Sequence, residues 1–199
     1  MAIVPDRGGK NNRPLLTEHL VEGRACGSCI GCCSIYQIPA LQKPKYTLCK
    51  HCTGSSCAIY DDRPDDCRTF YCLWRRIAAM PEQVRPDKIG IVFTYEIYHP
   101  PPTPFQRRYI IGRAINDPSV FDKPMGRAAV NMFILEGSLP VFIAHALETK
   151  MVYPDPDFSD AILNPTTTRH VALVPAALAW REQYGMSWGT REGAASTGR

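Results

Sequence analysis

The chain has 199 residues, of which 45% are hydrophobic, and its formal net charge is +4. This length and apolar content predict one domain, or one domain with a small appendage, and exclude both a disordered chain and a miniature disulfide scaffold. The charge excess is too small to require an anionic partner, so we do not expect nucleic acid as a partner.

The N-terminus lacks the apolar core of a signal peptide, and no apolar run approaches the roughly 20 residues of a membrane span. We therefore expect a cytoplasmic protein without a membrane partner. Residues 1–20 show no periodicity and are predicted to form a flexible leader. Cytosolic thiols are kept reduced, so clustered cysteines in that compartment indicate metal more often than disulfides.

Residues 21–80 form a cysteine-rich segment. To about residue 63 it is rich in Gly, Pro, Ser, Lys and Cys, which predicts irregular loops. Its last part carries apolar residues at helical spacing, and Asp65 or Asp66 can cap the start. The pattern predicts one amphipathic helix. The apolar residues that carry it are Phe70, Leu73, Trp74 and Ile77.

Residues 81–188 read as an α+β body. Alternation over 89–98 and strand character over 107–115 predict a hairpin around a proline-rich loop. A helix is expected from Pro124 to Gly137, with Met125, Ala128, Ala129, Met132 and Phe133 on one face. One or two further strands are expected over 140–147 and 149–153. A loop over 154–168, a short strand, a helix from Pro175 and a disordered tail over 189–199 complete the chain.

The predicted fold is therefore α+β. An irregular cysteine-rich N-terminal metal-binding segment packs on a small antiparallel sheet with two to four helices.

All the cysteines lie between residues 26 and 72. An odd number of thiols also argues against a closed set of internal disulfides. We predict that they are metal ligands: Cys26, Cys29, Cys32, Cys33, Cys49, Cys52, Cys57, Cys67 and Cys72.

The spacing of the thiols suggests two kinds of metal. Two residues between cysteines let a tight turn aim two sulfurs at one centre, and Cys49 with Cys52 fits half of a zinc site. Cys26, Cys29 and Cys32 instead resemble the three successive ligands that bacterial ferredoxins supply to a [4Fe–4S] cluster, although the usual Cys-Pro pair is missing. Iron–sulfur, with [4Fe–4S] first, and zinc both stay open.

Several details bear on the ligand set. Adjacent Cys32 and Cys33 point in different directions, so one centre need not use both. Cys67 and Cys72 are five positions apart, roughly 140° of rotation on an ideal helix. We therefore expect Cys67 at or before the first turn and Cys72 inside the helix. His51 is either a zinc ligand in place of a thiol or a surface residue.

The run CGSCIGCC, followed by CAIYDDRPDDCRTFYC, resembles the YkgJ-type cysteine-cluster family, a zinc- or iron-chelating domain. The resemblance covers about residues 24–75 and implies metal binding without fixing the metal. It extends to Cys49 and Cys52, as in some relatives. A related motif occurs in flagellin lysine N-methylases, but this chain is much shorter and lacks a glycine-rich nucleotide loop. The family pattern maps onto Cys26, Cys29, Cys32, Cys33, Cys57, Arg63, Pro64, Cys67 and Cys72.

Charged and aromatic residues near the thiols have two readings each. Arg63 and Arg68 either offset the negative charge of a thiolate cluster or pair with surface aspartates. Tyr60, Phe70 and Trp74 either shield a metal site or pack in the core. Arg113, with Arg107 and Arg108, either meets phosphate or belongs to the solvated face of the hairpin.

We expect a metal-binding protein in metal handling, electron transfer or sensing, with metal ions as its partners and another protein as an open alternative. One alternative is an enzyme that modifies a protein or small substrate with a metal cofactor. Another is a zinc-organised module that binds protein or RNA. No catalytic motif separates these alternatives, and a purely structural metal is also compatible with the thiols.

Overall fold

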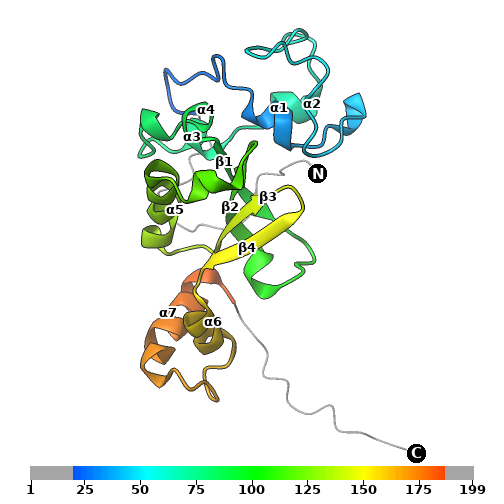
Figure 1. Cartoon of the computed structure of the whole chain (residues 1–199). Coiled ribbons are helices and arrows are strands. Elements are labelled where there is room, and N and C mark those ends of the chain that lie inside the picture. Colours follow the sequence, from blue (N-terminus) through cyan, green and yellow to red (C-terminus); the bar gives the residue numbers. More distant parts are fainter. Residues whose placement is uncertain (1–19, 187–199) are drawn as a thin grey trace, which may run out of the picture. The chain divides into compact units, whose positions relative to one another are not determined.

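The computed structural model describes residues 20–186 (Figure 1). The predicted leader, apart from Leu20, and the predicted tail lie outside the described residues. The chain divides into two compact units, the first ending at Tyr153 and the second beginning at Pro154. The cysteine-rich segment and the sheet belong to the first unit.

A four-stranded sheet forms the centre of the first unit, in the order β1-β2-β3-β4. The strands are β1 (Ile91–Ile97), β2 (Arg108–Ala114), β3 (Val141–His145) and β4 (Glu148–Tyr153). Strand β1 pairs with β2 and β3 with β4 in antiparallel fashion, whereas β2 and β3 are parallel.

The α+β class and the predicted hairpin strands are confirmed, and the region expected to hold one or two further strands holds two, but the sheet is mixed rather than wholly antiparallel. The reason is the crossover helix α5 (Pro124–Glu136), which returns the chain so that β3 starts in the same direction as β2. The predicted helix is confirmed, with Pro124 in its first turn and Gly137 ending it in a left-handed conformation.

The face that α5 buries differs from the predicted one. Gly126, Ala129, Val130 and Phe133 are buried, whereas Met125 and Ala128 are exposed. A Cβ at Gly126 would lie 1.9 Å from the carbonyl oxygen of Val120, so only glycine permits this close approach. That contact sets the rotation of the helix.

The two faces of β1 carry different layers, because alternate residues of a strand point to opposite sides. Phe93 packs on Phe133 of α5, with ring centroids 5.0 Å apart. On the other face, a Cβ at Gly31 in α1 (Gly31–Ile35) would lie 2.8 Å from Val92 Cγ2. The cysteine-rich segment thus packs against the face of β1 opposite α5.

The single helix predicted around residues 65–80 is wrong. Two one-turn helices replace it, α2 (Asp65–Arg68) and α3 (Leu73–Arg76). Cys72 has extended backbone angles, φ −68° and ψ 162°, which interrupt the helical path between them. Cys67 therefore sits inside α2, and Cys72 precedes α3 instead of lying within a helix.

Arg24 fixes the beginning of the cysteine-rich segment to its end. Its guanidinium donates hydrogen bonds to four backbone carbonyls, those of Trp74, Ile77, Ala78 and Met80. The Val21 N–H also donates to the Arg75 carbonyl at 2.9 Å. The first cysteines are thereby held close to the chain around α3.

Short helices complete the first unit. They are α4 (Pro86–Ile89) and the 3-10 turns η1 (Pro39–Leu41), η2 (Glu82–Val84), η3 (Pro104–Gln106) and η4 (Pro118–Phe121).

The second unit packs α6 (Pro156–Leu163) against α7 (Val174–Tyr184). The helix predicted from Pro175 is confirmed. The loop predicted over 154–168 is wrong, because Asp155 caps α6 by accepting from the Phe158 N–H at 2.9 Å. The short strand predicted before Pro175 is instead the 3-10 turn η5 (Val171–Leu173). Within residues 20–186, no helix has the length and apolar character needed to cross a membrane.

Candidate functional site

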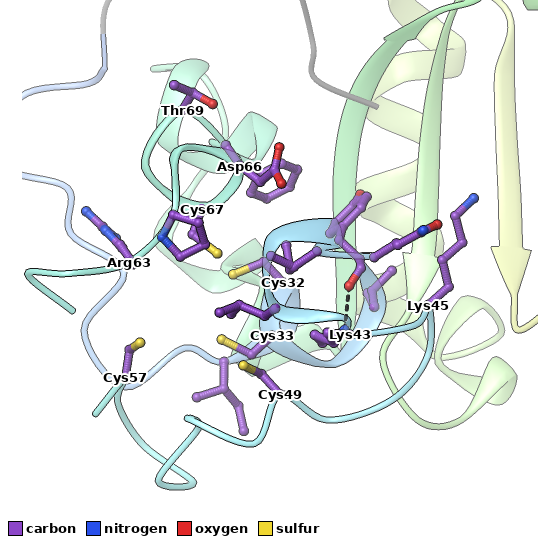
Figure 2. A pocket seen from close by; sticks show the side chains of 18 of the residues that line it. Cys32, Cys33, Lys43, Lys45, Cys49, Cys57, Arg63, Asp66, Cys67 and Thr69 are labelled. Carbon is purple, nitrogen blue, oxygen red and sulfur yellow. Dashed lines mark hydrogen bonds between the residues drawn. The ribbon is translucent and has the colours of Figure 1, made fainter. Parts of the chain in front are cut away.

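A cavity of about 540 Å³ lies between the cysteine-rich segment and strands β1 and β2 of the first unit. Its far wall includes Glu96, Tyr98, His99 and Arg113, and apolar side chains such as Ile35 and Phe70 contribute to it. Figure 2 shows thiol side chains from separate parts of the chain pointing into this space. The cysteines that line the cavity are Cys26, Cys29, Cys32, Cys33, Cys49, Cys57 and Cys67.

All nine cysteines are free thiols. Cys32 and Cys33 lie on α1, and Cys67 lies on α2. Cys52 and Cys72 are not among the residues that line the cavity. Short backbone links place Cys49, Cys52 and Cys57 near α1.

The backbone links run from α1 to the loops that follow it. The Cys49 N–H donates to the Cys33 carbonyl at 3.1 Å, and the Cys52 N–H donates to the Cys49 carbonyl at 2.9 Å. Cys52 and Cys57 form an isolated antiparallel bridge. Cys33 on α1 and the three cysteines of the following loops are thus linked through the main chain.

The thiols surround a space and do not meet at a point. Among residues 20–186, no three Cys, His, Asp or Glu side chains lie close enough together to hold a metal ion as they stand. The nine-ligand set inferred from the sequence therefore stays a prediction.

Neighbouring thiols change one another's acidity. A hydrogen bond between the two side chains lowers the pKa of Cys33 and raises that of Cys32. Burial is the main cause of the raised pKa of Cys29, Cys67 and Cys72, which reaches about 11 for Cys72. Most of these thiols therefore hold their protons at neutral pH when nothing positive is bound between them.

Lys43 brings a positive charge into the wall of the cavity. Lys43 is only 6% exposed, and its ammonium donates to the backbone carbonyls of Tyr36 and Pro44. Burial lowers the pKa of Lys43, and negative charge on four sulfurs opposes that decrease: those of Cys49, Cys33, Cys32 and Cys67.

Arg75 is a second cation beside the thiols. Its Nη1 donates to the Cys26 sulfur at 3.6 Å, and its buried Nε has no hydrogen-bond partner within the described residues. Sequence reasoning missed both Lys43 and Arg75. Neither belongs to a spacing pattern, and only the folded chain shows which cations approach the sulfurs.

The two arginines that the sequence analysis considered as counter-charges for a thiolate cluster have other contacts. Arg68 donates to the backbone carbonyls of Arg63 and Asp61, and Arg63 lies over the Tyr60 ring at 3.8 Å from its centroid. Tyr60 is 54% exposed, so it does not shield the thiols from water.

Two aromatic residues and one histidine near the thiols differ in their surroundings. Trp74 is buried in the core, and Phe70 lines the cavity and packs on Tyr36. The side chain of His51 does not line the cavity.

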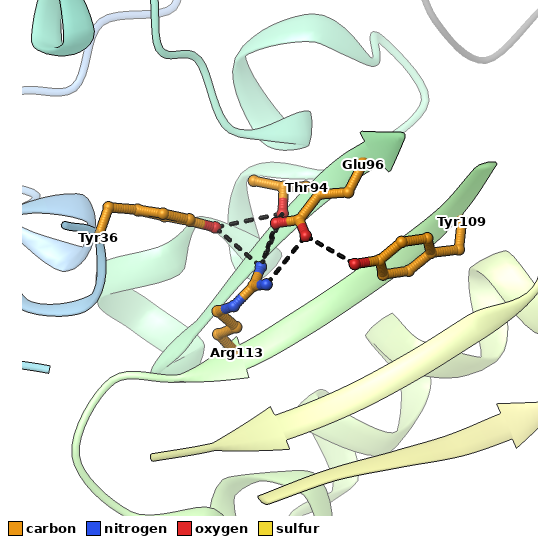
Figure 3. A network of polar contacts seen from close by, with 5 residues as sticks. All are labelled: Tyr36, Thr94, Glu96, Tyr109 and Arg113. Atoms are coloured by element: carbon orange, nitrogen blue, oxygen red, sulfur yellow. Dashed lines mark hydrogen bonds and ion pairs between the residues drawn. The ribbon is translucent and has the colours of Figure 1, made fainter. Parts of the chain in front are cut away.

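A polar network occupies the sheet side of the cavity (Figure 3). Arg113 donates to both oxygens of Glu96, at 2.6 and 3.1 Å, and also to Thr94 and Tyr36. Tyr109 donates to the second Glu96 oxygen at 2.9 Å. Arg113 is therefore part of a mostly buried ion pair and not of a solvated hairpin face. Burial raises the pKa of the Tyr36 phenol to about 12, so it stays protonated.

No family model matches the chain, and no curated protein or solved structure matches it either. The resemblance to the YkgJ-type family therefore stays a prediction drawn from the motif itself.

Proposed function

We propose that this protein binds metal through its clustered thiolates, as an iron–sulfur protein of a reducing compartment. The cavity between the cysteine-rich segment and β1 holds the metal. The observation that carries the proposal is the buried ammonium of Lys43 and its sulfur neighbours.

A buried ammonium is costly unless an opposite charge offsets it. Among the described residues, no carboxylate forms an ion pair with Lys43. The neighbours whose negative charge would offset it are cysteine sulfurs, once these are ionised. A neutral thiol offsets nothing, whereas a thiolate does. Lys43 is therefore suited to a state in which several of these sulfurs are ionised, as they are when they bind metal.

The form of the cavity favours a cluster over a single ion. Seven cysteines are spread around about 540 Å³, and no three of them meet at one point. A tetrahedral zinc site draws four donors to one centre, whereas a [4Fe–4S] cluster separates its four cysteines at the corners of a larger object. The successive two-residue spacing of Cys26, Cys29 and Cys32 supports the same choice.

The position of the thiols suits electron transfer or sensing. Cys26 is exposed, so a centre held there is within reach of a redox partner or an oxidant. Metal handling is also compatible with an accessible thiol.

The experiment is to express the full chain with and without oxygen and to record its visible absorption after anaerobic purification. An iron–sulfur cluster gives a brown protein whose colour bleaches on reduction or exposure to air. A colourless protein that contains zinc rejects the cluster but keeps the thiolate site.

A second candidate is an enzyme that uses the metal as a cofactor, and the cavity itself favours it. A volume of about 540 Å³ is within the range of about 300–1,000 Å³ for small-molecule sites. His99 and Glu96 line the same space as the thiols. Metabolite-sized compounds that perturb the spectrum of the metal-loaded protein support this candidate, and a spectrum insensitive to all of them opposes it.

A further inference from the structure

We infer that the nine thiols form two metal centres, divided between the adjacent residues Cys32 and Cys33. The inference rests on the proposed function, which it extends from one site to two. The Cys26 group consists of Cys26, Cys29 and Cys72, with Cys32 as its fourth thiol. The Cys33 group consists of Cys33, Cys49, Cys52, Cys57 and Cys67.

The chain has more thiols than one metal centre uses. A zinc ion and a [4Fe–4S] cluster each take four cysteines. Nine thiols are too many for one such centre, and they make two sets of four with one to spare. The spare thiol belongs to the Cys33 group, where Cys52 and Cys57 face each other in a backbone bridge.

Long-range contacts assemble the Cys26 group. Arg24 binds the carbonyls of Trp74 and Met80, which holds the chain before Cys26 against the chain after Cys72. A tight turn joins Cys29 to Cys26, with 2.9 Å between the Cys29 nitrogen and the Cys26 oxygen. The electrostatic neighbours of Cys72 are Cys26 and Cys29, in agreement with this placement.

Main-chain links assemble the Cys33 group separately. The Cys49 N–H donates to the Cys33 carbonyl, and the Cys52 N–H donates to the Cys49 carbonyl. Cys52 and Cys57 pair in an isolated antiparallel backbone bridge. Cys67 lies on α2, and its electrostatic neighbours include Cys33, Cys49 and Cys57. Figure 2 shows Cys33, Cys49 and Cys67 pointing into one space, with Cys32 beside them.

Each group has its own cation. Arg75 Nη1 donates to the Cys26 sulfur at 3.6 Å, and its buried Nε lacks an acceptor in the described part of the chain. An unsatisfied buried donor is costly, so this one points to an acceptor that the protein atoms do not supply. Lys43 takes the corresponding place in the Cys33 group. Two separate cations fit two separate negative centres.

The thiols of Cys32 and Cys33 contact each other, so the two centres lie side by side. Consecutive residues on a helix point about 100° apart, which lets one of them serve each centre.

Two double variants of the full chain, purified without oxygen, test the division. C26S/C72S removes two ligands of the first centre, and C49S/C67S removes two of the second. We expect each to lose part of the bound metal and keep the rest, with the two losses adding up to the wild-type content. Complete loss in both variants, with the sheet still folded by circular dichroism, overturns the inference and leaves a single centre. Wild-type protein without any metal instead rejects the proposed function.

If the cysteine variants do not fold, two variants that each remove a positive charge test the division into two centres. Arg75→Met and Lys43→Met keep every thiol, and Lys50→Met is an exposed control beside Cys49. In a redox titration we expect the first two to lower the potential of different centres and the control to change neither. If both variants shift the redox potential of the same centre, the inference is overturned.

Discussion

The guanidinium of Arg113 binds both carboxylate oxygens of Glu96, at 2.6 and 3.1 Å, in the wall of the cysteine-lined cavity. Tyr36, which directly follows α1, shares this network through its hydroxyl group. The network therefore joins the helix that carries Cys32 and Cys33 to strands β1 and β2. Its strength should determine how firmly the thiols are held.

Glu96→Gln should weaken this connection. Burial alone would raise the pKa of the Glu96 carboxyl, but the charge and hydrogen bonds of Arg113 outweigh it and lower the pKa. Because the folded-state pKa lies below the unfolded value of about 4.3, the stabilisation is present above that value and is lost as pH falls through the folded-state pKa. We expect a loss of roughly 3 kcal/mol at neutral pH, since Arg113 loses its counter-charge.

Urea unfolding at several pH values measures this effect. Below about pH 4 the stability of the wild type should fall more steeply than that of Glu96→Gln. Glu148→Gln, an exposed change on β4, is the control. Parallel pH curves for Glu96→Gln and the wild type would show that the ion pair does not stabilise the fold.

Gly31→Ala should separate α1 from the sheet. The added Cβ would lie 2.8 Å from Val92 Cγ2 and 2.9 Å from Ile115 Cδ1, closer than packed carbons tolerate. Overpacking of this kind costs about 1–3 kcal/mol. Thermal unfolding should show that loss, and the metal-bound spectrum should change because Cys32 and Cys33 move with the helix. Ser34→Ala on the same helix is the control, and a Gly31→Ala protein with wild-type stability would contradict the packing described for α1.

Lys43→Met should weaken metal binding without removing a ligand. The thiolates around the metal lose a nearby positive charge, and we expect about a tenfold lower affinity, equivalent to about 1.4 kcal/mol. Competition with a chelator measures the change. Lys50→Met, which alters an exposed lysine, should bind metal like the wild type. Equal affinities for all three proteins would mean that Lys43 does not compensate thiolate charge.

Metal binding should release protons. Burial raises the pKa of Cys29, Cys67 and Cys72, so these thiols are protonated at neutral pH in the metal-free protein. Each must lose its proton to become a ligand, and the apparent affinity should therefore rise with pH. Metal titration in weakly buffered solution should register two or more protons per centre. An affinity that is constant between about pH 6 and 8 would indicate that these thiols are not ligands.

The regular elements of the sheet could be predicted because their signals are local. Alternation around Phe93 identifies β1, and Pro124 with Gly137 brackets α5. Helix α6 was missed although Asp155 and Pro156 form an ordinary helix start, because the surrounding Pro, Asp and Thr residues are typical of loops. Local patterns therefore account for most of the strands and for two of the longer helices.

The arrangement of the site could be predicted only in part. Thiol density identifies the segment, but Arg24 reaches Met80 and Arg75 reaches Cys26 across about fifty positions of sequence. No spacing rule contains such contacts. Lys43 lies among Gln, Pro and Lys residues with no periodicity, so its burial beside the sulfurs is a property of the folded chain alone.

The most direct test is the amount of iron, zinc and inorganic sulfide per chain in wild-type protein purified without oxygen. We predict bound iron with a nearly equal amount of sulfide, about four of each for every [4Fe–4S] cluster that the chain holds. Zinc without sulfide would contradict the cluster, and a folded chain that contains neither metal would contradict the thiolate centre itself.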